Sequence, residues 1–139
     1  MHTVMNQDPL GFLQAESLEA SLTVGHLDRS VAWYCDAIGF VLDRRYERGG
    51  QLTAVSLRAG AVRILLSQDD GAKGAERVKG EGISLQITTS QKAEEVASRI
   101  KAHGNALDTE PTRMPWGVTI LRVRDPDGFR LTISSTHPV

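Results

Sequence analysis

Hydrophobic and polar residues alternate at several places along the chain, and each alternating stretch predicts a β-strand with one buried face. Between Leu18 and Val24, apolar positions alternate with Glu19, Ser21 and Thr23. A period of two places the apolar side chains on one side of a strand and the polar ones on the other. Seven further strands are predicted, many of them bounded by glycine-containing turns, at residues 40–47, 51–58, 61–68, 83–88, 106–113, 117–124 and 129–134.

Two other stretches have apolar residues at helical spacing. The first is expected to begin at an N-cap, Asp28, and to end at Gly39. Its predicted apolar face consists of Val31, Tyr34, Cys35 and Ile38. Trp33 is expected to pack in the core or an interface, and Cys35 to be a buried thiol. The second helix is predicted over residues 90–103, with Gly104 ending it.

The order of these elements repeats. "SLTV" at 21–24 resembles "SLQI" at 84–87, and "RILLS" at 63–67 resembles "RLTIS" at 130–134. This predicts two βαβββ modules, a tandem duplication within one structural domain. The predicted divisions are a tail or short helix, the first module, a linker, the second module and a C-terminal tail, at 1–16, 17–68, 69–81, 82–135 and 136–139. Each sheet would carry a helix on one face, and two such sheets would enclose a cleft where function is expected.

Composition narrows the classes of function. The chain has 139 residues, 40% of them hydrophobic, and a net charge of -1, which fits one domain with its own core. A nearly neutral chain has no overall field to attract nucleic acid or an anionic membrane. The N-terminus does not resemble a signal peptide, no apolar run reaches the ~18 residues of a membrane span, and one cysteine excludes an intrachain disulfide. A cytoplasmic location is expected.

Two motifs carry a resemblance to a known family. "VGHLDRSVAWYCDAIGF" at 24–40 and "WGVTILRVRDPDGFRLTIS" at 116–134 resemble the first helix and the last hairpin of the vicinal oxygen chelate superfamily, the glyoxalase/bleomycin-resistance/dioxygenase group. The resemblance covers roughly residues 18–135. It implies an α+β fold of tandem βαβββ modules, which form a cupped eight-stranded mixed sheet with helices on the outer face. A homodimer is also expected by resemblance, with pockets that two subunits can share.

The resemblance also implies where metal-dependent members hold their ion. Those ligand positions map here to Glu19, Leu65, Gly82 and Thr132. Only Glu19 offers a strong ligand, whereas a catalytic divalent metal generally needs about three protein ligands. The histidines have no ligand spacing on one element. We therefore predict no metal and no other cofactor.

A cup without metal is expected to bind a small organic molecule through polar side chains. By alternation, the candidate ligand-binding residues are Glu19, Ser21, Thr23, Gln86, Trp116, Arg130 and Thr132. Trp116 is interpreted either as a hydrophobic plug over the barrel end or as a stacking surface for a planar ligand. Glu19 is either an ordinary exposed carboxylate or, in a dry pocket, a proton acceptor, and it is the one candidate catalytic residue.

The leading functional hypothesis is a metal-free, bleomycin-resistance-like protein that sequesters an antibiotic or a metabolite. One alternative is a metal-dependent lyase, isomerase or dioxygenase of the same superfamily with unconventional ligands. A second is an acid–base enzyme that uses Glu19, and a third is a module that binds a protein partner and catalyses nothing. The expected partners are a small ligand and a second copy of the chain, without nucleic acid or membrane.

Overall fold

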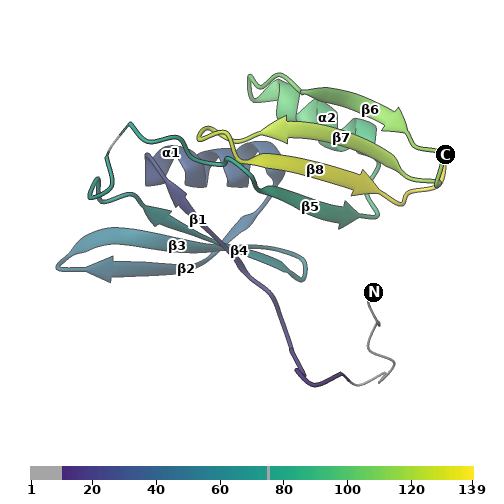
Figure 1. Ribbon diagram of the computed structural model, residues 1–139. Helices are drawn as coiled ribbons and strands as arrows, with labels where there is room; N and C mark the ends of the chain where they lie inside the picture. The colour runs from purple at the N-terminus through teal and green to yellow at the C-terminus, as the bar shows by residue number, and fades with distance from the viewer. Residues whose placement is uncertain (1–10, 75) are drawn as a thin grey trace.

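The computed structural model describes residues 11–74 and 76–139 and contains two βαβββ modules (Figure 1). The first module comprises β1 (Ala20–Val24), α1 (Leu27–Ala32), the π-helical turn η1 (Trp33–Ile38), β2 (Val41–Arg48), β3 (Gln51–Ala59) and β4 (Val62–Gln68). The second comprises β5 (Ser84–Thr89), α2 (Ala93–Ala102), β6 (Thr109–Arg113), β7 (Thr119–Arg124) and β8 (Arg130–Ser135). None of the helices in these described ranges is long and apolar enough to span a membrane.

Each module builds its own four-stranded mixed sheet. The strand order is β1-β4-β3-β2 in the first and β5-β8-β7-β6 in the second. In both, the first strand pairs in parallel with the last, and the remaining pairs are antiparallel. The predicted α+β class and tandem modules are confirmed. The eight strands are divided between two sheets, in which β1 and β5 are edge strands.

One hydrophobic core joins the two modules. The face of each sheet that packs under helices is mostly apolar, and the predicted positions Leu22 and Val24 of β1 are buried there. Leu131 and Ile133 of β8 take the equivalent places in the second module and belong to the same cluster of buried residues. The alternation read from the sequence therefore assigns the buried face of both sheets correctly.

The helices of the two modules pack against each other. Helix α2 contacts η1, and the Arg99 guanidinium of α2 donates to the Asp36 carbonyl at 2.9 Å. The Trp33 indole N–H donates to Asn105 Oδ1 at 3.0 Å. Because the helical sides meet along this seam, the opposite, helix-free faces of the sheets point away from it (Figure 1). The prediction that both sheets of one chain enclose a common cleft is therefore wrong.

The first helix differs from its prediction in start and in shape. It begins at Leu27 with His26 at the N-cap position, so Asp28 lies in the first turn and is not the cap. From Trp33 the helix widens, and the N–H groups of Gly39 and Phe40 both donate to the Tyr34 carbonyl. The buried face consists of Leu27, Ser30, Trp33, Tyr34 and Ala37. Cys35, predicted to be buried, is only half-buried.

Most of the described linker is exposed, but its end is held against the second module. Lys79 Nζ lies 2.9 Å from Asp69 Oδ2, with both side chains under 10% exposed. Gly80 is buried, and a Cβ built on it would lie 2.7 Å from the backbone of Gly128. The pKa of Asp69 is lowered, first by the backbone N–H of Gly71 and then by Lys79. The linker thus covers the turn between β7 and β8.

The N-terminal segment leaves the body of the molecule as an extended arm (Figure 1). Residues 13–19 form neither helix nor strand, so of the two predicted alternatives the described part is a tail and not a short helix, while residues 1–10 lie outside the described residues. Phe12, Leu13 and Leu18 on this arm are each more than 80% exposed. Elsewhere element ends differ from prediction by up to three residues, the largest differences being at the starts of α2 and β6.

Candidate functional site: the helix-free sheet faces

The helix-free face of the second module brings three of the predicted ligand-binding residues together. Gln86 of β5 lies opposite Thr132 of β8, and Thr132 lies opposite Arg122 of β7. Neighbouring strands are about 4.8 Å apart, so the side chains of Gln86, Thr132 and Arg122 form a row across the sheet. Arg130 stands two positions before Thr132, on the same face and exposed. Thr132 itself is only 8% exposed, as expected for a residue on an inner strand.

The helix-free face of the first module holds the remaining strand positions. Ser21 of β1 lies opposite Leu65 of β4, and Thr23 lies opposite Ser67. Leu65 in turn lies opposite Ser56 of β3. Glu19 is exposed and precedes β1 by one residue, so no strand pairing fixes its direction. The predicted residues thus form two groups, one on each sheet, and within one chain the two faces point in different directions.

Trp116 lies apart from both groups. It sits at the tip of the hairpin between β6 and β7, where the Gly117 N–H donates to the Met114 carbonyl at 3.0 Å. Its side chain is 69% exposed. A side chain this exposed packs little against its own chain, and both interpretations, the plug over the barrel end and the stacking surface, stay predictions.

The four positions implied for a metal do not fit one. Leu65 and Thr132 lie on different sheets, and Gly82 is exposed ahead of β5 with a φ of +75°. Only Glu19 carries a strong oxygen ligand, and Thr132 adds a hydroxyl. Among residues 11–74 and 76–139, no three His, Cys, Asp or Glu side chains gather closely enough to hold an ion. The residues present therefore do not support a conventional divalent site.

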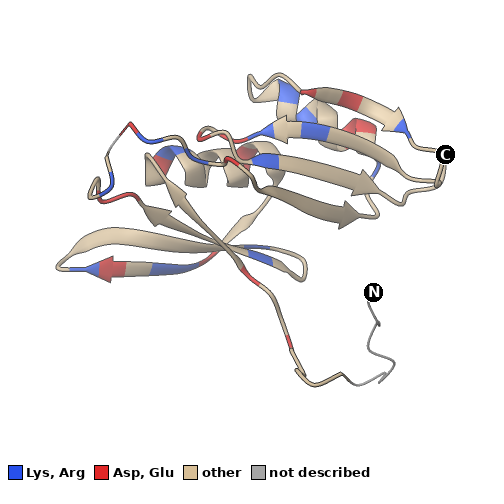
Figure 2. Ribbon diagram, viewed as in Figure 1, with Lys and Arg blue, Asp and Glu red and all other residues tan. Residues whose placement is uncertain are grey.

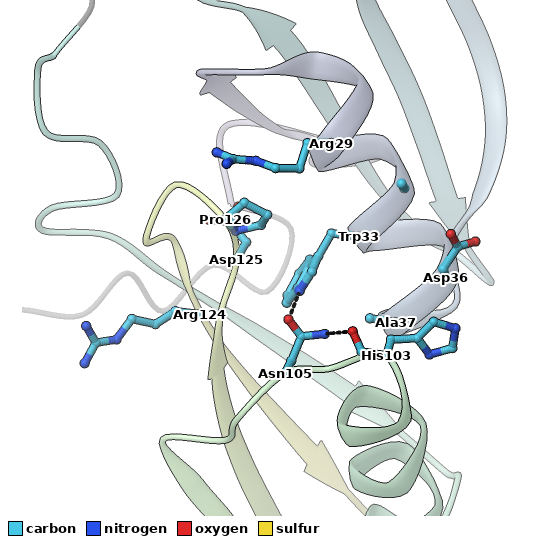
Figure 3. Close-up of a pocket in the computed structure, with 10 residues that line it drawn as sticks. Arg29, Trp33, Asp36, Ala37, His103, Asn105, Arg124, Asp125 and Pro126 are labelled. Carbon is cyan, nitrogen blue, oxygen red and sulfur yellow. Dashed lines mark hydrogen bonds between the residues drawn. The ribbon is translucent and has the colours of Figure 1, made fainter.

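Three cavities in the described part of a single chain lie along or beside the seam between modules. One of about 430 Å³ is lined by Trp33, Asn105, Arg29 and Pro126 among others, and Figure 3 shows the indole of Trp33 directed at Asn105. A second, of about 740 Å³, lies between the end of η1, the β3–β4 hairpin and the start of α2. A third, of about 360 Å³, lies beside the linker. None of these three is lined by a predicted site residue.

A buried polar pair fixes the turn that leads into β8. The Tyr34 hydroxyl donates to Asp125 Oδ2 at 2.7 Å, while the N–H groups of Asp127 and Phe129 donate to Asp125 Oδ1. Burial raises the pKa of Asp125 despite these hydrogen bonds. Burial also raises the pKa of Tyr34, and the carboxylate raises it further, so its hydroxyl stays protonated and donates. This arrangement orients the strand that carries Arg130 and Thr132.

Sequence reasoning missed the arginines that share these faces. Arg122 follows from the register of β7 against Thr132, and Arg44 follows from its place opposite Ser56. Two other arginines of these faces, Arg58 and Arg124, could have been found from the sequence. The similarity between "TAVSLR" at 53–58 and "TILRVR" at 119–124 places them at equivalent positions of the two modules.

The paired βαβββ modules, with helices on one side of each sheet and polar side chains on the other, define an α+β protein of the tandem-module class. Residues 16–133 match the model of the Glyoxalase/Bleomycin resistance protein/Dioxygenase superfamily. The chain belongs to this superfamily.

Relatives agree with this assignment. The chain is 29% identical over 127 residues to a "Probable lactoylglutathione lyase" of Synechocystis sp., covering 86% of this chain and 94% of that one. Among solved structures, TioX from Micromonospora sp. ML1 is similar with a TM-score of 0.72 and 20% identity, over 88% of this chain and 99% of that one. A lactoylglutathione lyase from Agrobacterium tumefaciens has a TM-score of 0.64 and 22% identity, over 87% and 93%. These structures support the fold.

Proposed function

We propose that the protein binds a small organic molecule without a metal, in a cup formed by the first module of one copy and the second module of another. The observation that carries this proposal is the outward direction of both helix-free faces, on which Ser21, Gln86 and Arg130 are exposed in one chain. Exposed polar sheet faces beside open edge strands are surfaces that a second copy can cover.

The edge strands give the proposed assembly its geometry. In the described residues, β1 and β5 each pair on one side only. If β1 of one copy lies beside β5 of another, the two four-stranded sheets become one eight-stranded sheet. This brings Ser21 and Thr23 of one copy near Gln86 and Thr132 of the other. A two-fold dimer built in this way contains two equivalent cups.

Complementation between two blocked variants tests the shared cup. Thr132→Trp fills the second-module face, and Ser21→Trp fills the first-module face, so each homodimer loses both cups. In a mixed dimer, one cup combines the two unaltered faces and the other combines the two blocked ones. After unfolding and refolding together, random pairing should restore about a quarter of the wild-type binding sites. Ligands are found by thermal shift, since binding raises the unfolding temperature.

Three results decide the outcome of this test. Sedimentation of each variant alone must still show a dimer, which separates blocked binding from lost assembly. Restored binding on mixing supports a cup shared between copies. A monomeric wild type, or binding that mixing does not restore although both variants dimerise, contradicts it.

The second candidate function is a metal-dependent lyase. The names of the Synechocystis and Agrobacterium relatives favour it, whereas the residues at the metal positions oppose it, since they supply one carboxylate and one hydroxyl. Turnover of lactoylglutathione, assayed with Zn²⁺, Ni²⁺, Mn²⁺ or Mg²⁺, decides between the two. Metal-stimulated turnover that Glu19→Gln abolishes would establish the lyase, and its absence with every metal would leave the binder. We place the protein in the cytoplasm.

A further inference from the structure

Each sheet carries two arginines directly opposite one another on its helix-free face. In the first module Arg58 of β3 lies opposite Arg63 of β4. In the second, Arg124 of β7 lies opposite Arg130 of β8. The two cross-strand pairs occupy equivalent places in the duplicated modules. Like charges directly opposite across a sheet are destabilising, so two such pairs in one chain point to a role other than stability.

In each cross-strand arginine pair, only one arginine is neutralised by an aspartate. Arg63 lies 3.1 Å from Asp43, and Arg124 lies 2.8 Å from Asp108. Within the described part of the chain, Arg58 and Arg130 take part in no ion pair. Both are exposed, so the cross-strand pair in each module leaves one guanidinium without a carboxylate partner on the face proposed to line the cup.

Further arginines extend these faces. Arg44 of β2 lies opposite Ser56, and Arg122 of β7 lies opposite Thr132. The two faces together hold six of the chain's twelve arginines, although its net charge is -1. Asp43 and Asp108 pair with Arg63 and Arg124, and two further exposed carboxylates, Glu47 on β2 and Glu19 just before β1, belong to the first module. Figure 2 shows basic segments on β7 and at the start of β8. The proposed cup is therefore cationic in a nearly neutral protein.

From this distribution we infer that the ligand is a small organic anion bearing a carboxylate or a phosphate. This inference rests on the proposed function, because it assigns the chemical class that the cup accepts. A guanidinium offers a planar fork of N–H donors that matches two oxygens of either group. On the second module, Arg122 and Arg130 flank the Thr132 hydroxyl, which adds a neutral donor beside them. The anionic group binds between Arg122 and Arg130, and the rest of the molecule extends across the sheet toward Gln86.

Matched probes test the charge of the ligand. Acid, amide and amine members of the same series (phenylacetate, phenylacetamide and phenethylamine, with indole and alkyl equivalents) differ little in shape. Phenyl phosphate and inorganic phosphate separate phosphate from carboxylate recognition. Binding is measured by calorimetry at low and at high salt, since exposed charges are screened by salt. The acids or phosphates should bind, the amides more weakly, and the amines not at all.

Substitutions test whether Arg122 and Arg130 bind the anionic group. Arg130→Gln and Arg122→Gln should each weaken binding of the anionic probe by about 10-fold or more, the usual loss for one charged hydrogen bond. Arg113→Gln is the matched control, because Arg113 lies on the same sheet opposite Thr119, on the helical side. Arg130→Gln should also leave the unfolding temperature unchanged or raise it, because it relieves the repulsion from Arg124. A merely structural arginine would lower both stability and binding.

The possible outcomes separate this inference from the proposed function. Amide or amine probes that bind as well as acids, with their binding restored by mixing the blocked variants, overturn the anion assignment and leave the shared cup standing. Equal losses in Arg113→Gln and Arg130→Gln overturn it as well. If no probe binds and mixing restores nothing, both proposals fail. Selective binding of acids or phosphates, lost in Arg122→Gln and Arg130→Gln, supports the inference.

Discussion

Gly80 offers a sharp test of how the linker is held. Its φ is +73°, and a Cβ there would lie 2.7 Å from the Gly128 carbonyl group and the Phe129 nitrogen. Gly82 has nearly the same φ, +75°, but a Cβ on it would meet nothing within 4 Å. The pair therefore separates backbone conformation from packing, because Gly80→Ala incurs both costs and Gly82→Ala only the first.

The expected magnitudes follow from these two contributions. A left-handed conformation costs an L-residue about 1–2 kcal/mol, and forced overlap in a packed region costs about 1–3 kcal/mol more. Gly80→Ala should then lower the free energy of unfolding by about 2–5 kcal/mol, and Gly82→Ala by about 1–2 kcal/mol. Urea unfolding followed by circular dichroism measures both, with the slope against urea unchanged. Equal destabilisation of the two variants would refute the close contact between the linker and the β7–β8 turn.

Three further predictions concern buried or half-buried titratable groups. Tyr34→Phe should lower the free energy of unfolding by about 2 kcal/mol in the same urea assay, since it removes a buried hydrogen bond to a carboxylate. Because burial raises the folded-state pKa of Asp125, its contribution is fully present below the unfolded pKa and is lost as pH rises through the folded pKa. The stability of the wild type relative to Asp125→Asn should therefore increase as pH falls from 7 to 4, and a flat difference would contradict this. Burial and then Asp36 raise the pKa of the Cys35 thiol, so its reaction with a disulfide reagent at pH 8 should be slower than that of free cysteine and faster in Asp36→Asn.

The buried faces of the strands could be predicted from sequence, because alternate residues of a strand point to the same face and the buried ones are apolar. Leu22 and Val24 in β1, and Leu131 and Ile133 in β8, are buried as predicted. The internal similarity of the two halves indicated the duplicated topology. The start of the first helix could not be predicted in the same way, since Asp28 is a good N-cap by residue type, while the chain already turns at His26. The π-helical turn has no simple periodic signature in the sequence, and Trp33 and Ala37, which were not on the predicted apolar face, are buried.

The site was predicted as a set of faces but not as an assembled cavity, and the reason is physical. Alternation tells which side of a strand a residue occupies, so Gln86, Arg130 and Thr132 were placed together correctly. Which face of one module meets which face of the other depends on a few polar contacts without periodicity. Trp33 with Asn105 and Arg99 with the Asp36 carbonyl are such contacts.

These contacts also determine how a cup can form from the helix-free faces. The seam holds the two helical sides together through a shared core, so bringing the helix-free faces of one chain together would require breaking that core. The edge strands β1 and β5 carry no such constraint, because each has an unpaired side. Closing a cup with a second copy keeps the core intact and covers the faces that bear the unbalanced Arg58 and Arg130. The two arginines would then lie in a less hydrated space, where an anionic ligand relieves their repulsion and contributes most to binding.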